Sequence, residues 1–378
     1  MSRWQKRVKA NNIPEGWTKC RLGDIADIKM GQSPKSESYN DSGEGLPFLQ
    51  GSRTFGSRYP LIDTYCTDPK IIANEGEILF SVRAPVGNIN IADKKICIGR
   101  GLASLNAKNQ QNLFLFYLLH FIKDDIINLE SGTVFGSVNK KDLESVPILL
   151  PPLPEQRAIA SIFPPIEDKI ELLRQENETL YNMINTLFKQ WFIKEAKEDW
   201  ERPKLGEVVT ITYGKNLPTK NLLESGYPVF GSNGQIGFYN EYMYDEPQVL
   251  ISCRGAASGK VNISLPKSFV TNNSFILVRD KRKDIPLEYL KYYCLNYDFT
   301  PYITGSAQPQ ITIDNLYNAE FLIPPLNLIN KFIEIVKVVE DKQINISEQI
   351  QTLTQLFDTL LHGLMSGKLR VDDVLCQS

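Results

Sequence analysis

The chain contains the same helical pattern twice, and this repeat limits its possible folds more than any other feature. The stretches PPLPEQRAIASIF and PPLNLINKFIEIV begin at Pro151 and Pro324, 173 positions apart. After each, apolar residues recur in alternating steps of four and three, the spacing of coiled-coil core positions. The core positions are Ile159, Phe163, Ile166, Ile170, Leu173, Asn177, Leu180, Ile184, Leu187 and Trp191 in the first stretch, and Phe332, Val336, Val339, Gln343, Ile346, Ile350, Leu353, Phe357, Leu360 and Leu364 in the second. The sequence therefore predicts two long, matching helices, each with one apolar stripe that must be covered.

Each apolar stripe has one polar interruption, Asn177 in the first and Gln343 in the second. A single polar core residue lowers the stability of a coiled coil and often fixes its register. If the helices pair antiparallel, the numbers of facing residues add up to about 520, as those of Asn177 and Gln343 do. We therefore predict an antiparallel pair in which the two amides lie within one layer of each other. The alternative is that each amide is only tolerated in a loosely packed layer.

A pair of prolines, Pro164 and Pro165, lies inside the first helical stretch. Proline has no N–H to donate within a helix, and its ring clashes with the preceding turn. Proline is acceptable, however, at the first position of a new helix. The sequence thus predicts a break after Phe163 and a new helix from Pro165, whereas the second helix contains no such interruption.

The segments that precede the two helices also match each other. LGDIADIKMGQSP from Leu22 corresponds to LGEVVTITYGKNLP from Leu205, and GEILFSVRAPVGNINI (76–91) corresponds to PQVLISCRGAASGKVNI (247–263). Short runs rich in Val, Ile, Phe and Tyr, separated by Gly, Pro, Asn and Asp, indicate strands and turns. The same order of motifs in both copies predicts two similar folded domains.

These patterns predict an α+β protein with a pseudo-two-fold internal repeat. Two mixed α/β domains, at 1–150 and 200–323, are separated by helical segments at 151–199 and 324–378. The helical segment 151–199 includes the break predicted near Pro164-Pro165. We expect the two long helices to form an antiparallel coiled coil, because each is the obvious partner for the apolar stripe of the other.

Several classes of protein are disfavoured by the composition. The chain contains no run of about 18 apolar residues, the length needed to span a bilayer. Its N-terminus lacks the apolar core of a secretory signal. The six cysteines never form a C-x-x-C pair, which favours reduced thiols in a cytoplasmic protein and argues against a zinc site. The net charge of −2 gives no overall attraction to nucleic acid, although the helical segments carry the negative charge and 1–150 is net positive.

Motifs of known catalytic sites are missing from the chain. GAASGKV (255–261) has one residue too few before Gly-Lys to be a phosphate-binding loop, and strand-like sequence follows it. FGSNGQIG (230–237) is better explained by hairpin turns than by a dinucleotide-binding loop. Nor does the chain contain the Asn-Pro-Pro-aromatic tetrapeptide of adenine methyltransferases. We therefore predict a protein without catalytic residues and without a metal site.

The whole chain resembles the specificity subunit of type I restriction–modification systems. The resemblance is carried by the domain starts LGDI and LGEV, by PPLPEQRAIASIF, by GSAQPQIT and by the closing LLHGLMSGKLRV. It implies that 1–150 and 200–323 are target-recognition domains, each of which reads one half of a bipartite DNA sequence. It also implies that the coiled coil sets the spacing between them, much as dimer geometry sets half-site spacing in other DNA-binding proteins.

The same resemblance implies partners and cofactors outside this chain. Two methyltransferase (modification) subunits would dock on the coiled coil, and restriction endonuclease subunits would join the complex on double-stranded DNA. S-adenosylmethionine, ATP and Mg²⁺ would be bound by those partner subunits, with no cofactor in this chain and no membrane involved.

Polar side chains in glycine-flanked loops, at matching places in both copies, are the candidates for reading DNA. Arg, Lys, Asn, Gln and Ser are the residue types that contact base edges. The candidates are Gln32, Ser33, Arg53, Arg83, Ser137, Asn139 and Lys140 in the first copy, and Lys215, Asn216, Asn233, Arg254, Gln308 and Gln310 in the second. Each could instead be an ordinary solvated loop residue, and Arg83 and Arg254 could support the fold. Base readers are expected where the copies differ, since the two domains should read different sequences.

Two other functions remain open at this point. The chain could be a coiled-coil scaffold or protein-interaction protein without sequence-specific DNA binding, and binding to a bipartite duplex would separate the two hypotheses. It could also be a recognition module for another class of restriction enzyme, although the complete second helix and the short tail after Arg370 disfavour this.

Overall fold

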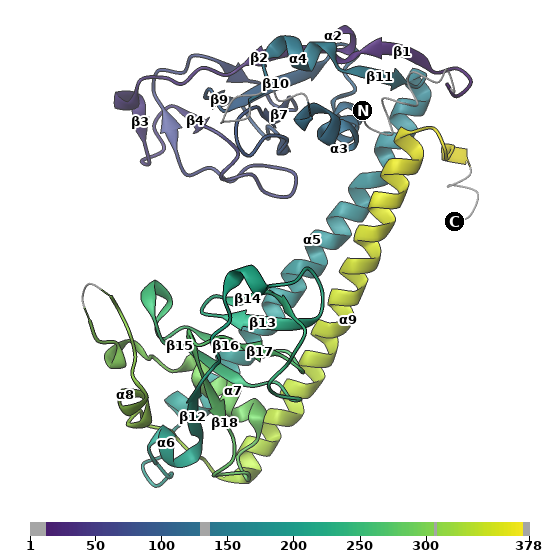
Figure 1. Cartoon of the computed structure of the whole chain (residues 1–378). Helices are drawn as coiled ribbons and strands as arrows, with labels where there is room; N and C mark the ends of the chain where they lie inside the picture. Colours follow the sequence, from purple (N-terminus) through teal and green to yellow (C-terminus); the bar gives the residue numbers. More distant parts are fainter. Residues whose placement is uncertain (1–12, 129–136, 306–307, 373–378) are drawn as a thin grey trace. The chain divides into compact units, whose positions relative to one another are not determined.

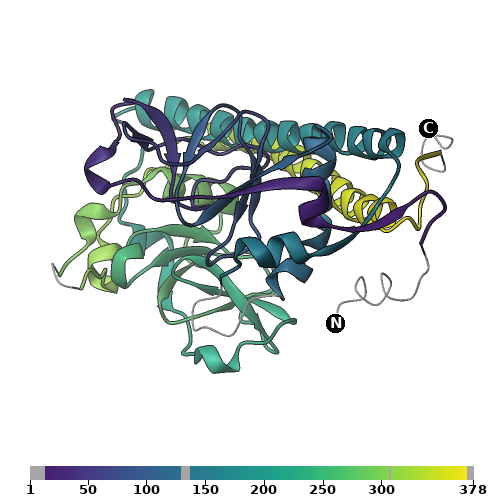
Figure 2. The same cartoon turned by 90° about the horizontal axis from the view of Figure 1, so that it is seen from above.

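The computed structural model describes residues 13–128, 137–305 and 308–372. The chain divides into two compact units, each of which contains part of both long helices. Unit 1 comprises residues 1–174 and 348–378, and unit 2 comprises residues 175–347. The two long helices are α5 (Leu153–Lys189) and α9 (Leu326–Met365), drawn in teal and yellow in Figure 1 and seen from above in Figure 2.

Unit 1 is built on a four-stranded antiparallel sheet. In spatial order its strands are β2 (Ala26–Met30), β10 (Leu102–Ala107), β7 (Ile78–Ser81) and β8 (Ile89–Ile91). One face of this sheet is covered by α3 (Asn112–Ile127), whose buried aromatic and aliphatic residues form the main core. Strands β1 (Thr18–Arg21) and β11 (Pro147–Leu150) form a separate antiparallel pair, next to the short helices α2 (Leu22–Ile25) and α4 (Lys140–Ser145).

A second sheet of unit 1 packs on the first through a smaller apolar cluster. Leu49 and Ile98 of the second sheet contact Leu79 and Leu102 of the first. The strands of this sheet are β3 (Tyr39–Asn40), β5 (Tyr65–Cys66), β4 (Leu46–Leu49), β9 (Ile96–Ile98) and β6 (Ile72–Ala73), in spatial order. Strands β4 and β9 are parallel, so both end at the same edge of the sheet.

Unit 2 repeats this architecture, as the sequence predicts. Its four-stranded sheet is β12 (Thr210–Tyr213), β18 (Ser274–Val278), β15 (Val249–Ser252) and β16 (Val261–Ile263), in the same spatial order as in unit 1. Its second sheet is β14 (Gly234–Tyr239), β13 (Tyr227–Gly231) and β17 (Phe269–Val270), with β13 and β17 parallel. The helices α6 (Leu205–Val208), α7 (Leu287–Asn296) and α8 (Ile313–Tyr317) correspond to α2, α3 and α4. The predicted α+β fold with an internal repeat is therefore confirmed.

The long helices run antiparallel within each unit. In unit 1, the rings of Phe163 and Phe357 lie 5.2 Å apart, and in unit 2 those of Phe188 and Phe332 lie 5.6 Å apart. In both pairs the two residue numbers add up to about 520, the sum predicted for facing residues of an antiparallel pair. Gln343 Nε2 donates to the backbone carbonyl of Asn177 at 3.3 Å. The antiparallel pairing is confirmed, whereas the role of these two amides in fixing the register stays a prediction.

The predicted break at Pro164-Pro165 is wrong. Helix α5 continues through both prolines without interruption. The two prolines remove the helical donors to the carbonyls of Ala160 and Ser161. Pro165 and Ser161 are exposed, so water can solvate the Ser161 carbonyl, whereas Pro164 is half-buried and Ala160 is buried. Packing of the neighbouring Phe163 ring against Tyr117 and Phe357 favours the helical path.

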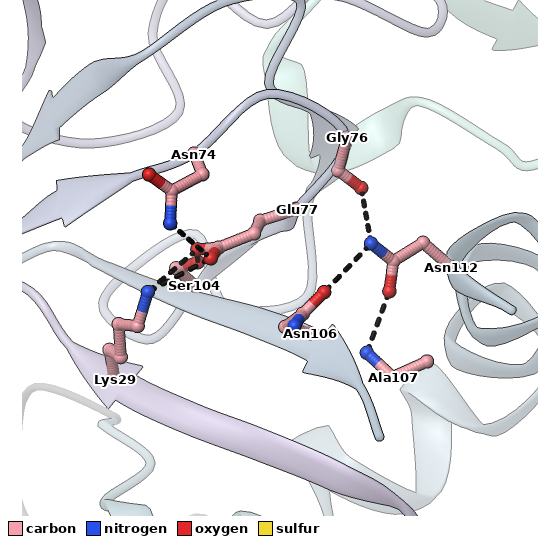
Figure 3. A network of polar contacts seen from close by, with 8 residues as sticks. All are labelled: Lys29, Asn74, Gly76, Glu77, Ser104, Asn106, Ala107 and Asn112. Atoms are coloured by element: carbon pink, nitrogen blue, oxygen red, sulfur yellow. Dashed lines mark hydrogen bonds and ion pairs between the residues drawn. The ribbon is translucent and has the colours of Figure 1, made fainter. Parts of the chain in front are cut away.

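The buried carboxylate of Glu77 connects β2, β10 and the turn before β7 in unit 1 (Figure 3). Glu77 is only 4% exposed, and it accepts hydrogen bonds from Lys29 at 2.9 Å, from Asn74 at 2.8 Å and from Ser104. Beside it, Asn112 accepts from the Ala107 N–H and donates to the Gly76 carbonyl, which holds the start of α3 to the sheet. In unit 2 the position of Glu77 is taken by Gln248, whose carbonyl accepts from the Ser264 N–H as that of Glu77 accepts from the Ala92 N–H. The position of Ser104 is taken by Ile276, which packs in an apolar cluster.

This network predicts an acid-sensitive contribution to the stability of unit 1. Burial alone raises the pKa of the Glu77 carboxyl, but hydrogen bonds from Ser104, Lys29 and Asn74 outweigh burial and hold the pKa below its ordinary value of 4.5. A lowered pKa in the folded state stabilises the fold above the ordinary pKa, and this stabilisation is lost as the pH falls below 4.5 toward the folded-state value.

Glu77→Gln tests this prediction. The variant is expected to lose about 1–3 kcal/mol of unfolding free energy at pH 7, since hydrogen bonds to a charged group are removed. Urea unfolding at pH 7 and at pH 4 should show a smaller loss on acidification for the variant than for the parent chain. Glu75→Gln, on an exposed side chain of the same turn, is the matched control and should leave the pH dependence unchanged; equal behaviour of both variants would contradict the prediction.

Candidate nucleic-acid interface

In unit 1, four chain segments end or turn at one edge of the sheets. Strands β2 and β7 both run antiparallel to β10, and their last residues, Met30 and Ser81, pair with Ala103 and Leu102 at the start of β10. The turn between β9 and β10 is hydrogen-bonded to the end of β4, since the Gly99 N–H donates to the Leu49 carbonyl at 2.8 Å. We call this edge, with the loops that continue from it, the strand-end edge of unit 1.

Three arginines come together at the strand-end edge of unit 1. Arg53, Arg83 and Arg100 line a cleft of about 650 Å³, together with Gln50 and Asn88. Arg83 and Arg100 are exposed, and neither forms an ion pair with another residue of the described segments. A cleft with two available guanidinium groups is suited to a polyanion.

The other candidates in unit 1 differ in how far the structure engages them. The Ser33 hydroxyl donates to Gln50 Oε1 at 2.9 Å and accepts from the Arg100 N–H at 3.3 Å, so it holds the cleft together. Gln32 is exposed, and its N–H donates to the Ile98 carbonyl. Arg53 forms an ion pair with Asp63 at 2.5 Å, and this hydrogen bond lowers the pKa of the Asp63 carboxyl.

The last three candidates of unit 1 lie just before and at the start of α4. Ser137 is exposed and forms a β-bridge with Arg83, which places it at the strand-end edge. Asn139 caps α4, because its side chain accepts from the Asp142 N–H at 3.1 Å. Lys140 lies 3.6 Å from Glu144, one helical turn on. The structure thus gives Asn139 and Lys140 local structural contacts, while their contact with DNA stays a prediction.

Unit 2 has a strand-end edge of the same construction. The last residues of β12 and β15, Tyr213 and Ser252, pair with Phe275 and Ser274 of β18. Lys215 forms a β-bridge with Thr271, and its N–H donates to the Val270 carbonyl. In unit 1 the Gln32 N–H donates to the equivalent carbonyl, that of Ile98. The predicted candidates of unit 2 are all exposed; they are Lys215, Asn216, Asn233, Arg254, Gln308 and Gln310.

The two arginines that the sequence alignment matched occupy equivalent places in the fold. Arg83 bridges to Ser137 in unit 1, and Arg254 bridges to Gln310 in unit 2. Asn233 lies nearby in unit 2, where its Oδ1 accepts from Lys260 Nζ at 3.5 Å. Within each unit, the structure therefore joins candidates from loops far apart in the sequence, Arg83 with Ser137 and Arg254 with Gln310.

Arg100 and its counterpart Asn272 are residues that sequence reasoning missed. Both lie in the tight turn that leads into the central strand, β10 in unit 1 and β18 in unit 2. The signal was present in the sequence as GRG at 99–101, aligned with TNN at 271–273. The glycines that flank Arg100 have no counterpart beside Asn272, so a pattern of glycine-flanked positions shared by both copies does not include this turn.

A glutamate of each long helix holds its own α/β domain in place. In unit 1, Glu167 of α5 accepts from Arg58 at 2.8 Å and from the Tyr117 hydroxyl at 2.7 Å. Burial and the nearby Glu167 carboxylate raise the pKa of Tyr117 above its usual range, so it donates as a neutral phenol. In unit 2, Glu340 of α9 pairs with Lys291 and accepts from Tyr292. Glu167 and Glu340 are 173 positions apart, so the repeat extends to this contact.

Other kinds of site have no support in the described segments. Within residues 13–128, 137–305 and 308–372, no group of three or more His, Cys, Asp and Glu side chains is arranged to hold a metal ion. Every helix in these segments is too short or too polar to cross a lipid bilayer.

Comparison with known proteins gives a consistent family. The model described as "Type I restriction modification DNA specificity domain" matches residues 14–182 and 197–355. The type I restriction enzyme MjaIX specificity subunit of Methanocaldococcus jannaschii is 23% identical over 429 residues, with 98% of each chain covered. The putative MjaX specificity subunit of the same organism is 48% identical over 179 residues, which are 46% of this chain and 42% of that relative.

A solved structure shows the same fold. The S subunit of a type I restriction–modification system from M. genitalium superposes with a TM-score of 0.55 at 21% identity, and the match covers 94% of this chain and 97% of that one. The two family matches fall on the two structural repeats and include most of both long helices. The chain therefore belongs to the type I restriction–modification DNA specificity family, and it carries two copies of the family's domain.

Proposed function

We propose that this chain selects the DNA site of a type I restriction–modification complex, and that each unit reads one half of a split target. The observation that carries this proposal is the repeated strand-end edge, which has the same backbone frame in both units but different side chains. Gln32 in unit 1 is replaced by Lys215 in unit 2, and Arg100 is replaced by Asn272. A repeated frame with altered side chains is what two readers of different sequences require.

Residues that both units share fit a different task. Arg83 and Arg254 occupy equivalent positions, and both are exposed beside the following loop. Because a residue common to both readers cannot distinguish their half-sites, we assign these arginines to phosphate contacts. Such contacts position the protein on the duplex and supply affinity that does not depend on sequence.

The chemistry on DNA belongs to partner subunits in this proposal. Methyltransferase subunits, two per chain, would dock on α5 and α9 and transfer the methyl group of S-adenosylmethionine to adenine. Restriction subunits would supply the ATP- and Mg²⁺-dependent activity. Docking is supported by apolar side chains that the helix pair leaves exposed, among them Met183 at 57%, Val338 at 71% and Ile344 at 59%. The assembly would work in the cytoplasm.

Co-expression of the full chain with its methyltransferase partner tests the proposed function. Methylated adenines, mapped across the genome of the expression host, are expected to define one motif of two short halves separated by an unspecified spacer of constant length. The purified complex should then bind a duplex with this motif more tightly than duplexes in which either half is scrambled. A continuous motif would contradict the two-reader arrangement, and binding without any sequence preference would favour the scaffold alternative.

A further inference from the structure

The β9–β10 turn of unit 1 has room for only one side chain. A Cβ atom on Gly99 would lie 2.4 Å from Gln50 Oε1 and 2.9 Å from Gln50 Cα, and a Cβ atom on Gly101 would lie 2.4 Å from the Gln50 carbonyl oxygen. Real Cβ atoms do not approach backbone atoms so closely, so both glycines are required by the close contact with the end of β4. Arg100, between them, is therefore the one residue of this turn that can extend a side chain from the strand-end edge.

The Arg100 side chain is available for a ligand. It is exposed, lines the cleft with Arg53 and Arg83, and forms no ion pair with a residue in the part of the chain that the structure describes. Arg53 is already engaged by Asp63 at 2.5 Å. The backbone of Arg100 is held at the same time, since its N–H donates to Ser33 Oγ at 3.3 Å. A fixed backbone below a free guanidinium group limits the entropy lost when the side chain binds.

Unit 2 has the same turn with a different residue at its tip. The Val82 N–H donates to the Gly101 carbonyl in unit 1, and the Cys253 N–H donates to the Asn273 carbonyl in unit 2, both at 2.9 Å. The Gly31 N–H donates to the Leu102 carbonyl in unit 1, and the Gly214 N–H donates to the Ser274 carbonyl in unit 2. These matching bonds place Asn272 where unit 1 has Arg100. The residue at the tip of this turn therefore differs between the two copies, whereas the position of Arg83 and Arg254 is an arginine in both.

From this geometry, and on the basis of the proposed function, we infer that the tip of this turn is a base-reading position, at which Arg100 selects a guanine and Asn272 selects an adenine. The guanidinium group of arginine donates two parallel hydrogen bonds to O6 and N7 of guanine in the major groove. The carboxamide of asparagine donates to N7 and accepts from N6 of adenine. The half-site of unit 1 then contains a guanine that depends on Arg100, and the half-site of unit 2 contains an adenine that depends on Asn272.

Motif mapping with single variants tests this assignment in the intact complex. Full-length Arg100→Ala, co-expressed with the methyltransferase, is expected to relax one guanine position in one half of the methylated motif and to leave the other half unchanged. Asn272→Ala should relax one adenine position in the other half. Arg100→Lys retains the positive charge and N–H donors but loses the planar, parallel pair of donors, so it should weaken selection of the same guanine less than Arg100→Ala does. Arg83→Ala is the matched control, because loss of a phosphate contact should weaken all sequences alike and preserve the motif.

Binding to modified duplexes identifies the contact itself. Replacing the assigned guanine by 7-deazaguanine removes N7, and this should weaken binding of the parent complex. Arg100→Ala is expected to lower affinity for the unmodified duplex about 10- to 100-fold and to be insensitive to 7-deazaguanine. A split motif that Arg100→Ala leaves unchanged, or a uniform loss like that of Arg83→Ala, would overturn the assignment but not the proposed function. Binding with no sequence preference in the parent complex would overturn both.

Discussion

Phe188→Ala is expected to lower the unfolding free energy of unit 2 by about 3–5 kcal/mol, the usual cost of removing a fully buried phenylalanine ring. Phe188 is 1% exposed and lies where α5, α7 and α9 meet. Its ring lies 5.0 Å from that of Phe192, 5.6 Å from that of Phe332 and 5.9 Å from that of Tyr289. Removing the ring leaves one cavity that borders both α9 and α7. The variant would therefore loosen both the helix pair and the attachment of the α/β domain to it.

Urea denaturation of the full chain, followed by circular dichroism and tryptophan fluorescence, measures this effect. Tyr181→Ala is the matched control, since Tyr181 lies on the same helix but is 46% exposed. Its substitution should change the unfolding free energy by less than about 1 kcal/mol, as expected for a surface position. Similar losses for Phe188→Ala and Tyr181→Ala would contradict the assignment of Phe188 to the shared core.

Gly31→Ala is expected to distort the strand-end edge of unit 1 and to destabilise that unit by about 1–3 kcal/mol, the range for overpacking a tight site. A Cβ atom at Gly31 would lie 2.2 Å from the Gly99 carbonyl oxygen and 2.8 Å from that of Leu102. Both are backbone atoms, so no side-chain rotation can relieve the clash. The β9–β10 turn must move away from β2, and this displaces Arg100 from the cleft.

Thermal unfolding and motif mapping of the co-expressed complex measure both consequences. Gly31→Ala should impair selection at the half-site read by unit 1, and the repeat-equivalent Gly214→Ala should impair the other half, since its Cβ atom would lie 2.2 Å from the Thr271 carbonyl oxygen. Gly51→Ala is the control, because its Cβ atom would meet no atom within 4 Å. If Gly31→Ala behaved like Gly51→Ala, the close approach would not be needed for the edge to form.

Periodicity predicted the long helices well, because a heptad stripe is determined by local sequence and needs only one partner surface. Phe163 and Phe357 are both predicted core positions, and their rings meet. Near the end of α5 the buried rings are those of Phe188 and Phe192, each one residue after the predicted core positions Leu187 and Trp191. Local rules failed at Pro164-Pro165, where they predicted a break in a helix that is continuous. Propensity describes an isolated segment, and here burial of Phe163 between Tyr117 and Phe357 outweighs the two lost hydrogen bonds.

Loop residues of the candidate interface could be predicted only in part. Matching the two copies found Arg83 and Arg254, whose equivalence the bridges to Ser137 and Gln310 make clear. It also included Asn139, which the structure shows to be a helix cap. A polar residue in a loop can face solvent, cap a helix or line a cleft, and sequence spacing does not distinguish these three environments.

By itself, the sequence determined the repeat, the two apolar stripes apart from their shift to Phe188 and Phe192 at the end of α5, and the family, since each is encoded in the order of residues along one segment. Only the tertiary structure showed that β2, β4, β7 and the β9–β10 turn meet at one edge, because this depends on strand order and register between segments distant in the chain. The tertiary structure also showed why Arg100 is the one residue of the β9–β10 turn that extends a side chain. The flanking glycines are required by contacts with Gln50, a residue about fifty positions earlier that folding brings within 3 Å.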